Sequence, residues 1–173
     1  MATDITLNEF RSSLAGDVAR SNRFLLSITK DAGLVEKQMK FLITKASIQR
    51  KSIDGPEFKY RGRTIKIAGD FKRDILNITL WNDSGWVARK FFENWLDEIV
   101  DTFENVRTEL KNYITSNSFF ELSILGLDGE VIAFYTFQDC FPFEISEIDL
   151  DQNAENQLQE FRVSFNFTRW IRK

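Results

Sequence analysis

Histidine is absent from this chain of 173 residues, and cysteine occurs only once, as Cys140. Histidine is the commonest general base and metal ligand, so its absence excludes Ser-His and Cys-His nucleophile systems and histidine-containing zinc sites. A single cysteine excludes an internal disulfide and is typical of synthesis in a reducing compartment. Because Cys140 precedes an aromatic-proline bend, we interpret it as a small core residue. Catalysis by carboxylates alone stays open.

Long apolar runs and flexible linkers are missing as well. No segment approaches the roughly 18 uninterrupted apolar residues of a membrane helix, and the N-terminal residues lack the basic head and apolar run of a signal peptide. The two prolines and eight glycines form no linker, and the 43% hydrophobic content supports a packed core. We therefore predict a single domain over residues 1–173, with 1–20 as an N-terminal arm or helix, and no membrane insertion.

Alternating apolar and polar residues predict about seven strands. They cover residues 22–30, 39–47, 59–68, 74–81, 118–126, 130–138 and 161–167. The tripeptides Leu127-Asp128-Gly129 and Asp54-Gly55-Pro56 are typical turn sequences. Gly69 is expected to supply a positive φ between two strands, because glycine adopts that conformation without strain.

One amphipathic helix is predicted directly after residues 82–85, with Asp83 or Ser84 as its N-cap. Its broad apolar face is expected to consist of Val87, Phe91 and Trp95, flanked by Ala88, Phe92, Leu96 and Ile99. A capping-box pair at residues 6 and 9 predicts a shorter helix within 3–18, and 101–117 is expected to be a partly helical connection. The predicted fold is mainly β: an antiparallel sandwich or barrel of about seven strands with one flanking α-helix.

Motifs for catalysis or for binding a metal or cofactor are weak. The acidic stretch from Asp149 to Glu160 imitates a calcium loop, but Ala154 stands where the loop needs glycine, and the flanks are strands instead of helices. Gly62 and Gly69 lack the spacing of a phosphate-binding loop. We therefore predict no catalytic, metal or cofactor residues, and we interpret the acidic stretch as a solvated turn. The chain is not expected to be an enzyme.

Charge is strongly segregated along the chain. Residues 45–73 contain nine basic and three acidic residues, whereas 139–160 contain seven acidic and no basic residues. A basic segment could bind nucleic acid, but only Phe58 and Tyr60 accompany it as stacking aromatics, and the whole chain has a net charge of −3. The pattern therefore favours contact between complementary surfaces of identical subunits.

Three places in the sequence resemble the tail tube proteins of contractile-tailed bacteriophages. The first begins with a strand and the Ala68-Gly69-Asp70 connection, and continues through a strand ending in Trp81-Asn82-Asp83 to the amphipathic helix. The second is Phe141-Pro142 followed by Leu150-Asp151 and a polar turn. The third is the aromatic-rich final segment, residues 159–171. The similarity covers most of residues 20–172.

The resemblance implies a β-sandwich or barrel that forms hexameric rings, which stack into the inner tube of a contractile tail. The implied partners are the chain itself and the sheath, tape-measure and baseplate proteins, and DNA passes without specific binding. The implied location is the virion tail after synthesis in the host cytoplasm. Other readings stay open: a baseplate ring that initiates the tube, the tube of a contractile injection machine, a monomeric ligand-binding β-barrel, or an enzyme that uses carboxylates.

Candidate assembly residues follow from charge and alternation. We expect a basic excursion at residues 47–63 to reach an adjacent subunit and to meet its acidic segment. The residues proposed for this stacking contact are Arg50, Lys51, Asp54, Lys59, Arg61, Glu147, Asp149, Asp151 and Glu155. The final strand is expected to support ring assembly through the packing of Phe161, Val163, Phe165 and Phe167. A bore that conducts DNA is expected to be polar, acidic or neutral.

Overall fold

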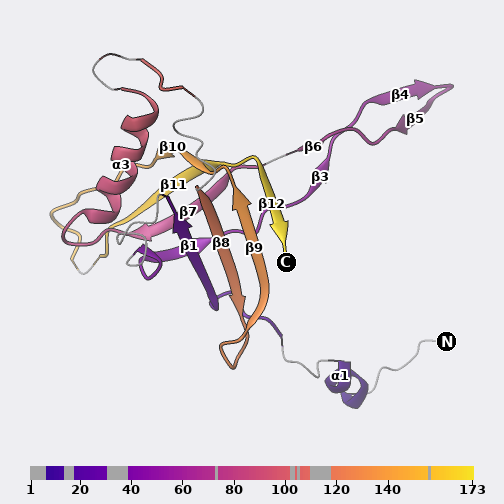
Figure 1. The fold of residues 1–173 in the computed structure, drawn as a ribbon. Helices are drawn as coiled ribbons and strands as arrows, with labels where there is room; N and C mark the ends of the chain where they lie inside the picture. The colour runs from indigo at the N-terminus through magenta and orange to yellow at the C-terminus, as the bar shows by residue number, and fades with distance from the viewer. Residues whose placement is uncertain are drawn as a thin grey trace.

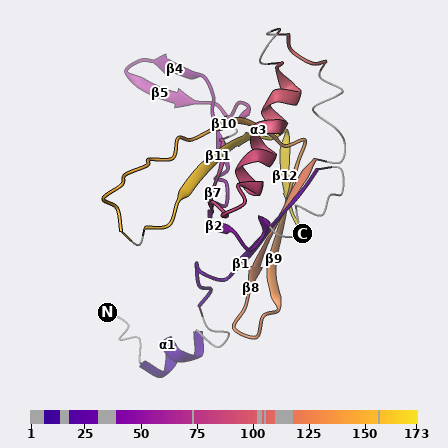
Figure 2. The same cartoon turned by 90° about the vertical axis from the view of Figure 1, so that its left-hand side faces the viewer.

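The computed structural model describes residues 7–13, 18–30, 39–72, 74–101, 104, 106–109, 118–155 and 157–173. In this part of the chain the fold is mainly β, as predicted (Figures 1 and 2). The elements, in chain order, are α1 Leu7–Ser13, β1 Phe24–Thr29, β2 Ile43–Ala46, β3 Ser52–Ile53, β4 Glu57–Tyr60, β5 Arg63–Lys66, β6 Phe71–Lys72, β7 Leu76–Trp81, α3 Val87–Ile99, β8 Phe119–Leu125, β9 Val131–Gln138, β10 Phe141–Ile145, β11 Glu160–Asn166 and β12 Arg169–Arg172.

Two antiparallel four-stranded sheets form the body of the molecule. Their strand orders are β1-β8-β9-β12 and β10-β11-β7-β2. The predicted hairpin joins β8 to β9, and Gly129 has the positive φ of 84° that its turn requires. Pro142 lies in β10, which is an edge strand where a missing backbone donor is tolerated. The final segment divides between the sheets, since β11 belongs to one and β12 to the other.

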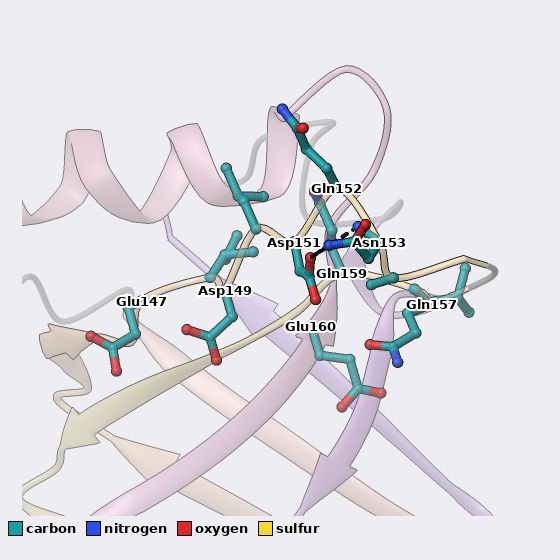
Figure 3. A pocket seen from close by; sticks show the side chains of 12 residues that line it. Glu147, Asp149, Asp151, Gln152, Asn153, Gln157, Gln159 and Glu160 are labelled. Carbon is teal, nitrogen blue, oxygen red and sulfur yellow. Dashed lines mark hydrogen bonds between the residues drawn. The ribbon is translucent and has the colours of Figure 1, made fainter.

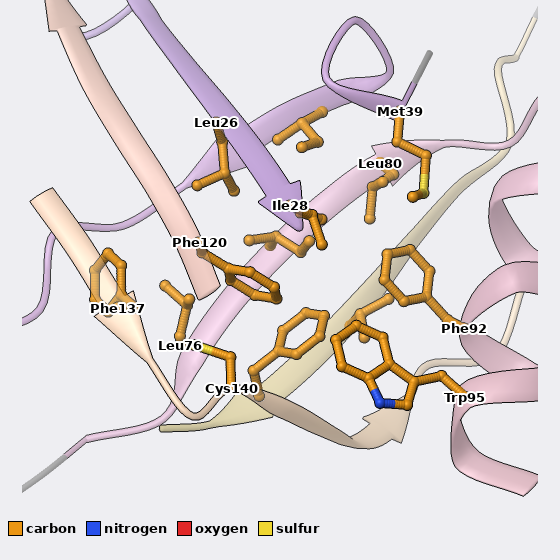
Figure 4. Close-up of a cluster of buried hydrophobic side chains, with 14 of the residues drawn as sticks. Leu26, Ile28, Met39, Leu76, Leu80, Phe92, Trp95, Phe120, Phe137 and Cys140 are labelled. Carbon is orange, nitrogen blue, oxygen red and sulfur yellow. The ribbon is translucent and has the colours of Figure 1, made fainter. Parts of the chain in front are cut away.

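The hydrophobic core joins both sheets to α3 (Figure 4). Phe165 of β11 makes an edge-to-face contact with Phe120 of β8 at 4.6 Å between ring centroids and another with Phe92 of α3 at 5.8 Å. Trp95 lies 6.2 Å from the same ring. All four aromatic side chains are at most 1% exposed. One phenylalanine on the inner strand β11 therefore connects the three parts of the body.

The helix α3 begins at Val87, later than an N-cap at Asp83 or Ser84 would place it, because the N-cap residue is Trp86. The carboxylate of Asp83 accepts hydrogen bonds from the backbone N–H groups of Val87 at 3.2 Å and Ala88 at 3.0 Å. Asp83 thus satisfies two donors at the N-terminus of the helix without being the N-cap residue, which is Trp86. The buried face consists of Ala88, Phe92, Trp95 and Ile99. All four belong to the broad apolar face predicted from the sequence, of which only Val87 remains exposed, at 42%.

Residues 59–68 do not form the single strand that was predicted. The chain reverses at Arg61-Gly62, so that β4 and β5 pair as a hairpin, with Phe58 opposite Ile65. The Asp54-Gly55-Pro56 segment is not a turn either, because it runs antiparallel to residues 67–70, with Gly69 N–H donating to the Asp54 carbonyl oxygen at 2.8 Å. The positive φ expected at Gly69 belongs to Gly62, at 76°.

Other predicted elements differ in extent. Strand β2 begins at Ile43, after a turn in which Leu42 N–H donates to the carbonyl of Met39. Most of 101–117 and the capping-box threonine at position 6 lie outside the described residues. Arg107 is described, and it forms an extended antiparallel bridge with Val100 instead of a helix. None of the helices in the described segments is long and apolar enough to traverse a bilayer.

Candidate functional site

The most exposed structured segment is residues 52–72, here called the basic arm. It extends from the body as a two-stranded ribbon made of the β3–β6 ladder and the β4–β5 hairpin (Figure 1). Every residue of β4 and β5 is exposed. A hairpin with no covered face is at best marginally stable in water. The arm therefore has the construction of a segment that packs against another surface.

A close backbone approach forms the narrow middle of the arm. A Cβ atom on Gly55 would lie 1.9 Å from the carbonyl oxygen of Ile67, and one on Gly69 would lie 2.5 Å from the carbonyl oxygen of Asp54. Two glycines are therefore required by the neighbouring strand, not by an unusual φ. The Asp54 carboxylate also accepts a hydrogen bond from Gly55 N–H at 2.9 Å, so this predicted site residue shapes the arm locally.

The tip of the arm presents one aromatic-aliphatic face and one charged face. Arg61 and Gly62 both have positive φ, 47° and 76°, as in the turns that connect tight hairpins. Phe58 and Ile65 lie opposite each other and are 54% and 53% exposed, and Tyr60 next to the turn is 62% exposed. On the other face Lys66 pairs with Glu57 at 2.7 Å. Apolar exposure of this kind on a polar-rimmed element is typical of a protein contact site.

The base of the arm holds two of the predicted stacking residues against the body. The Arg50 guanidinium donates to the Asp74 carboxylate, and this hydrogen bond, followed by the charge of Asp74, raises the pKa of Arg50. The Lys51 ammonium lies 4.5 Å from the Trp170 ring centroid. Arg50 and Lys51 therefore have contacts within their own subunit, whereas Lys59 and Arg61 lie at the exposed tip.

The second surface consists of residues 146–155 and 157–159, here called the acidic loop, which lie between β10 and β11 in the sequence. Figure 2 shows this loop extending from the sheets, and Figure 3 shows Glu147, Asp149 and Asp151 along an open hollow of about 840 Å³. All three are exposed, and so is Glu155, which does not line the hollow. The Asp151 carboxylate accepts a hydrogen bond from Asn153 N–H at 2.9 Å, which fixes a local turn. The same loop exposes Leu150 and Leu158, at 73% and 71%.

The calcium-like spacing does not converge on a common point. Glu160 accepts a hydrogen bond from the Trp81 indole N–H at 3.1 Å and lies 3.5 Å from the Lys45 ammonium. In the described ranges, no group of three or more carboxylate or thiolate side chains is placed to hold a metal ion. Burial raises the pKa of Cys140 to about 12, so its thiol stays protonated at neutral pH.

The four residues predicted to support ring assembly, in β11 and directly after it, lie inside the subunit. Phe161, Val163, Phe165 and Phe167 are at most 9% exposed, and β11 pairs with β10 on one side and β7 on the other. Ser164 on the opposite face is also buried, where it donates to Asn77 at 2.9 Å. These side chains can influence a ring only through the fold of the subunit. The strands at the sheet edges are β1, β12, β10 and β2.

A small groove at the base of the arm was missed in the sequence. About 220 Å³ in volume, it is lined by Phe71 and Lys72 of β6, by Arg169 and Trp170 of β12, and by Arg50, Lys51, Asp74 and Phe167. Phe71 is 65% exposed. The signal that was available is the Phe71-Lys72 pair directly after Asp70, where an aromatic residue follows a polar connection. That β6 and β12 line one groove could not be read from spacing, because they lie far apart in the sequence and belong to different sheets.

Comparisons with known proteins place the chain in a family. A sequence model described as phage tail tube protein matches residues 6–173. The tail tube protein gp19 of Enterobacteria phage T4 is 25% identical over 167 residues, covering 92% of this chain and 95% of the relative.

Solved structures agree on the fold. A chain in the sheath-tube complex of the extracellular contractile injection system PVC superposes with a TM-score of 0.62 at 17% identity, covering 94% of this chain and 96% of that one. A chain in the sheath/tube terminator of the same system gives 0.66 at 15% identity, covering 90% and 96%. These likenesses concern the fold, and the family follows from the sequence match. The chain belongs to the phage tail tube protein family and is a structural tube subunit.

Proposed function

We propose that this chain forms hexameric rings, and that the rings stack head to tail into the inner tube of a contractile tail through which DNA passes. The observation that carries the proposal is the pair of exposed surfaces, the basic arm and the acidic loop. They leave the body at opposite ends in Figure 1. Complementary surfaces at different places on one subunit produce heterologous contacts, which close into rings or propagate as filaments.

Stacking would bring the arm of one subunit to the acidic loop of another. Lys59 and Arg61 at the tip, with Arg50 and Lys51 at the base, are the donors, and Glu147, Asp149, Asp151 and Glu155 are the acceptors. An exposed ion pair contributes under about 1 kcal/mol, but a ring interface repeats each pair. Burial of the apolar face of the arm adds to these pairs, and covers side chains that a free subunit leaves in water.

The bore would be lined by the face of the β1-β8-β9-β12 sheet that points away from the core. Strand alternation places polar and apolar side chains there, between the buried positions: Ser27, Glu121, Ser123, Thr136 and Gln138, together with Leu25, Phe119 and Phe134. These side chains are uncharged or acidic, although Arg169 of β12 adds a cation near the sheet edge. Such a lining has few phosphate-binding groups, so DNA can move through it without being held.

The partners of such a tube are the sheath around it, the tape-measure protein within it and the baseplate below it. The virion tail is then the final location, after synthesis in the host cytoplasm. Electron microscopy and light scattering of the purified protein test the proposal directly. Rings or tubes are expected. A monodisperse species of 20.3 kDa at all concentrations would contradict it and favour a monomeric ligand-binding barrel.

The role of the arm is tested by reversing charge at its tip. The double variant Lys59→Glu/Arg61→Glu is expected to fold normally and to stop tube growth at low salt. Arg50 is unsuitable, because a glutamate there would face Asp74 within the same subunit. Lys40→Glu/Lys90→Glu changes the net charge equally outside the arm and is the matched control. Tubes of normal length from the tip variant would remove these two residues from the stacking contact.

A further inference from the structure

The groove at the base of the basic arm has the chemistry of a specific socket. Phe71 and Trp170 supply aromatic surface, and the basic residues of the lining are Arg50, Lys51, Lys72 and Arg169. Two of these cations already have partners within the subunit, since Arg50 pairs with Asp74 and Arg169 donates to Gln138. Asp74 is the single carboxylate of the lining, which leaves a net charge of +3. Aromatic surface surrounded by cations fits an apolar side chain that has a carboxylate on each side.

The acidic loop of this chain contains such a segment. Leu150 stands between Asp149 and Asp151 and is 73% exposed, more than any other large apolar side chain in the loop. Leu158 is exposed to a similar extent, 71%, but its neighbours are Gln157 and Gln159. Only the first leucine therefore carries charge that is complementary to the rim of the groove.

We propose that Leu150 of one copy of this chain inserts into the groove of a second copy, with Asp149 and Asp151 against the cations of its rim. The inference rests on the proposed assembly and identifies the residues of one of its inter-subunit contacts. A subunit cannot fill its own groove, because the loop and the base of the arm lie at opposite ends of the body in Figure 1. Each subunit thus offers one plug and one socket, as a propagating contact requires.

The leucine is expected to matter more than the charges around it. Exposed ion pairs contribute little because water and salt screen them, whereas an apolar side chain buried in an aromatic pocket is typical of the residues that dominate binding. The Lys51–Trp170 contact helps, since it keeps an ammonium at the rim of the groove while the Phe71 ring stays accessible. The socket is present before the partner arrives.

Cysteine cross-linking tests the contact in the assembled protein. The pair Asp151→Cys/Lys72→Cys preserves both Leu150 and the aromatic groove, and Cys140 is buried with a raised pKa, so it does not compete. We expect covalent oligomers at a yield about tenfold above those of Gln157→Cys/Lys72→Cys, because apposed thiols react at a high effective concentration. In the same background Leu150→Ser should abolish the gain, and Leu158→Ser should not.

The possible results separate this contact from the assembly itself. Rings or tubes without cross-links above the control would overturn the socket alone, as would equal effects of the two leucine substitutions. Particles that never form would contradict the proposed function as well. A nucleic-acid site is the other use of a basic, aromatic groove. If Lys51→Glu/Lys72→Glu abolished retention of a short fluorescent DNA duplex while assembly stayed normal, the groove would bind DNA and the proposal would be wrong.

Discussion

The body and the basic arm are both antiparallel β-structure, but only the body buries the apolar side chains of its strands. In β7 the residues alternate between fully buried and exposed or half-buried, so Leu76, Ile78 and Leu80 are 0% exposed. In β4 and β5 no residue is buried, although Phe58, Tyr60 and Ile65 are as apolar. The same alternation that closes a core in one region presents an open face in the other.

The difference shows that apolar side chains stabilise folding in the body, whereas in the arm they can stabilise only association. Core burial stabilises the subunit whether or not a partner is present. The apolar face of the arm can contribute only when a second surface covers it, so its substitution should affect association and leave folding almost unchanged. Variants of one residue type in the two regions can therefore test the comparison.

Phe165→Ala and Phe58→Ala form the first such pair, and Phe165→Ala should have the largest effect. Phe165 is 0% exposed and contacts Phe120, Phe92 and Trp95, so its loss should reduce the free energy of unfolding by about 3–5 kcal/mol. Phe58 is 54% exposed, and its substitution should change that free energy by less than about 0.5 kcal/mol. Urea denaturation followed by circular dichroism measures both.

The effect of Phe58→Ala on assembly completes the comparison. Phe58→Ala should fold like the wild type and form fewer or shorter tubes under the electron microscope. A loss of several kcal/mol on Phe58→Ala would show that the arm packs on its own body, and the distinction drawn between the two regions would then fail.

The sequence predicted much of the body because its signals are local, although two short edge strands, β10 and β12, were missed. The β8–β9 hairpin, the α3 helix and the alternation of Phe161, Val163 and Phe165 each follow from neighbouring residues. Asp83 was predicted as a possible N-cap, and it does accept hydrogen bonds from the first turn of α3, although the N-cap position itself is occupied by Trp86. The mainly β fold and the tail tube family are accordingly confirmed.

The arm was predicted less well because its glycines serve a contact between distant residues. Gly55 and Gly69 are ordinary turn signals in sequence, but in the structure each is required by the backbone of the opposite strand. The true reversal at Arg61-Gly62 was hidden, because asparagine or aspartate usually precedes the glycine in such turns. The groove was also missed, since β6 and β12 are brought together only by the complete fold. The proposed stacking residues stay predictions.

Asp83 tests a smaller effect within the body. Burial by itself would raise the pKa of this carboxyl, but hydrogen bonds from backbone N–H groups, those of Ala88 and Val87 first, outweigh burial and lower the pKa from 3.8. A lowered pKa means that the stabilisation is present above pH 3.8 and is lost as the pH falls through the lower folded value. Asp83→Ala should cost about 1 kcal/mol at pH 7.

The pH dependence identifies the carboxylate as the cause. The difference in unfolding free energy between wild type and Asp83→Ala should shrink as the pH falls below 3.8, which thermal unfolding at a series of pH values can follow. Ser84→Ala is the matched control, because Ser84 was the alternative cap and is exposed. Its change should be under about 0.5 kcal/mol. If Ser84→Ala were the more costly substitution, the cap would be assigned to the wrong residue.

Gly55→Ala should have the smallest effect on folding and sharpens the comparison most. The new methyl group would meet the carbonyl oxygen of Ile67 at 1.9 Å, which forces the two strands of the arm apart. The hydrogen bonds from Gly69 N–H to the Asp54 carbonyl and from Ile67 N–H to the Pro56 carbonyl should be lost. Hydrogen exchange should then be faster at Gly69 and Ile67, while the free energy of unfolding of the body changes by less than about 0.5 kcal/mol.

Gly62→Asn is the control, because asparagine tolerates the positive φ of the tip and nothing lies within 4 Å of a Cβ there. Tubes should form with Gly62→Asn and fail with Gly55→Ala, since only the second variant removes the shape of the arm. Normal tubes from Gly55→Ala would mean that stacking does not depend on the arm.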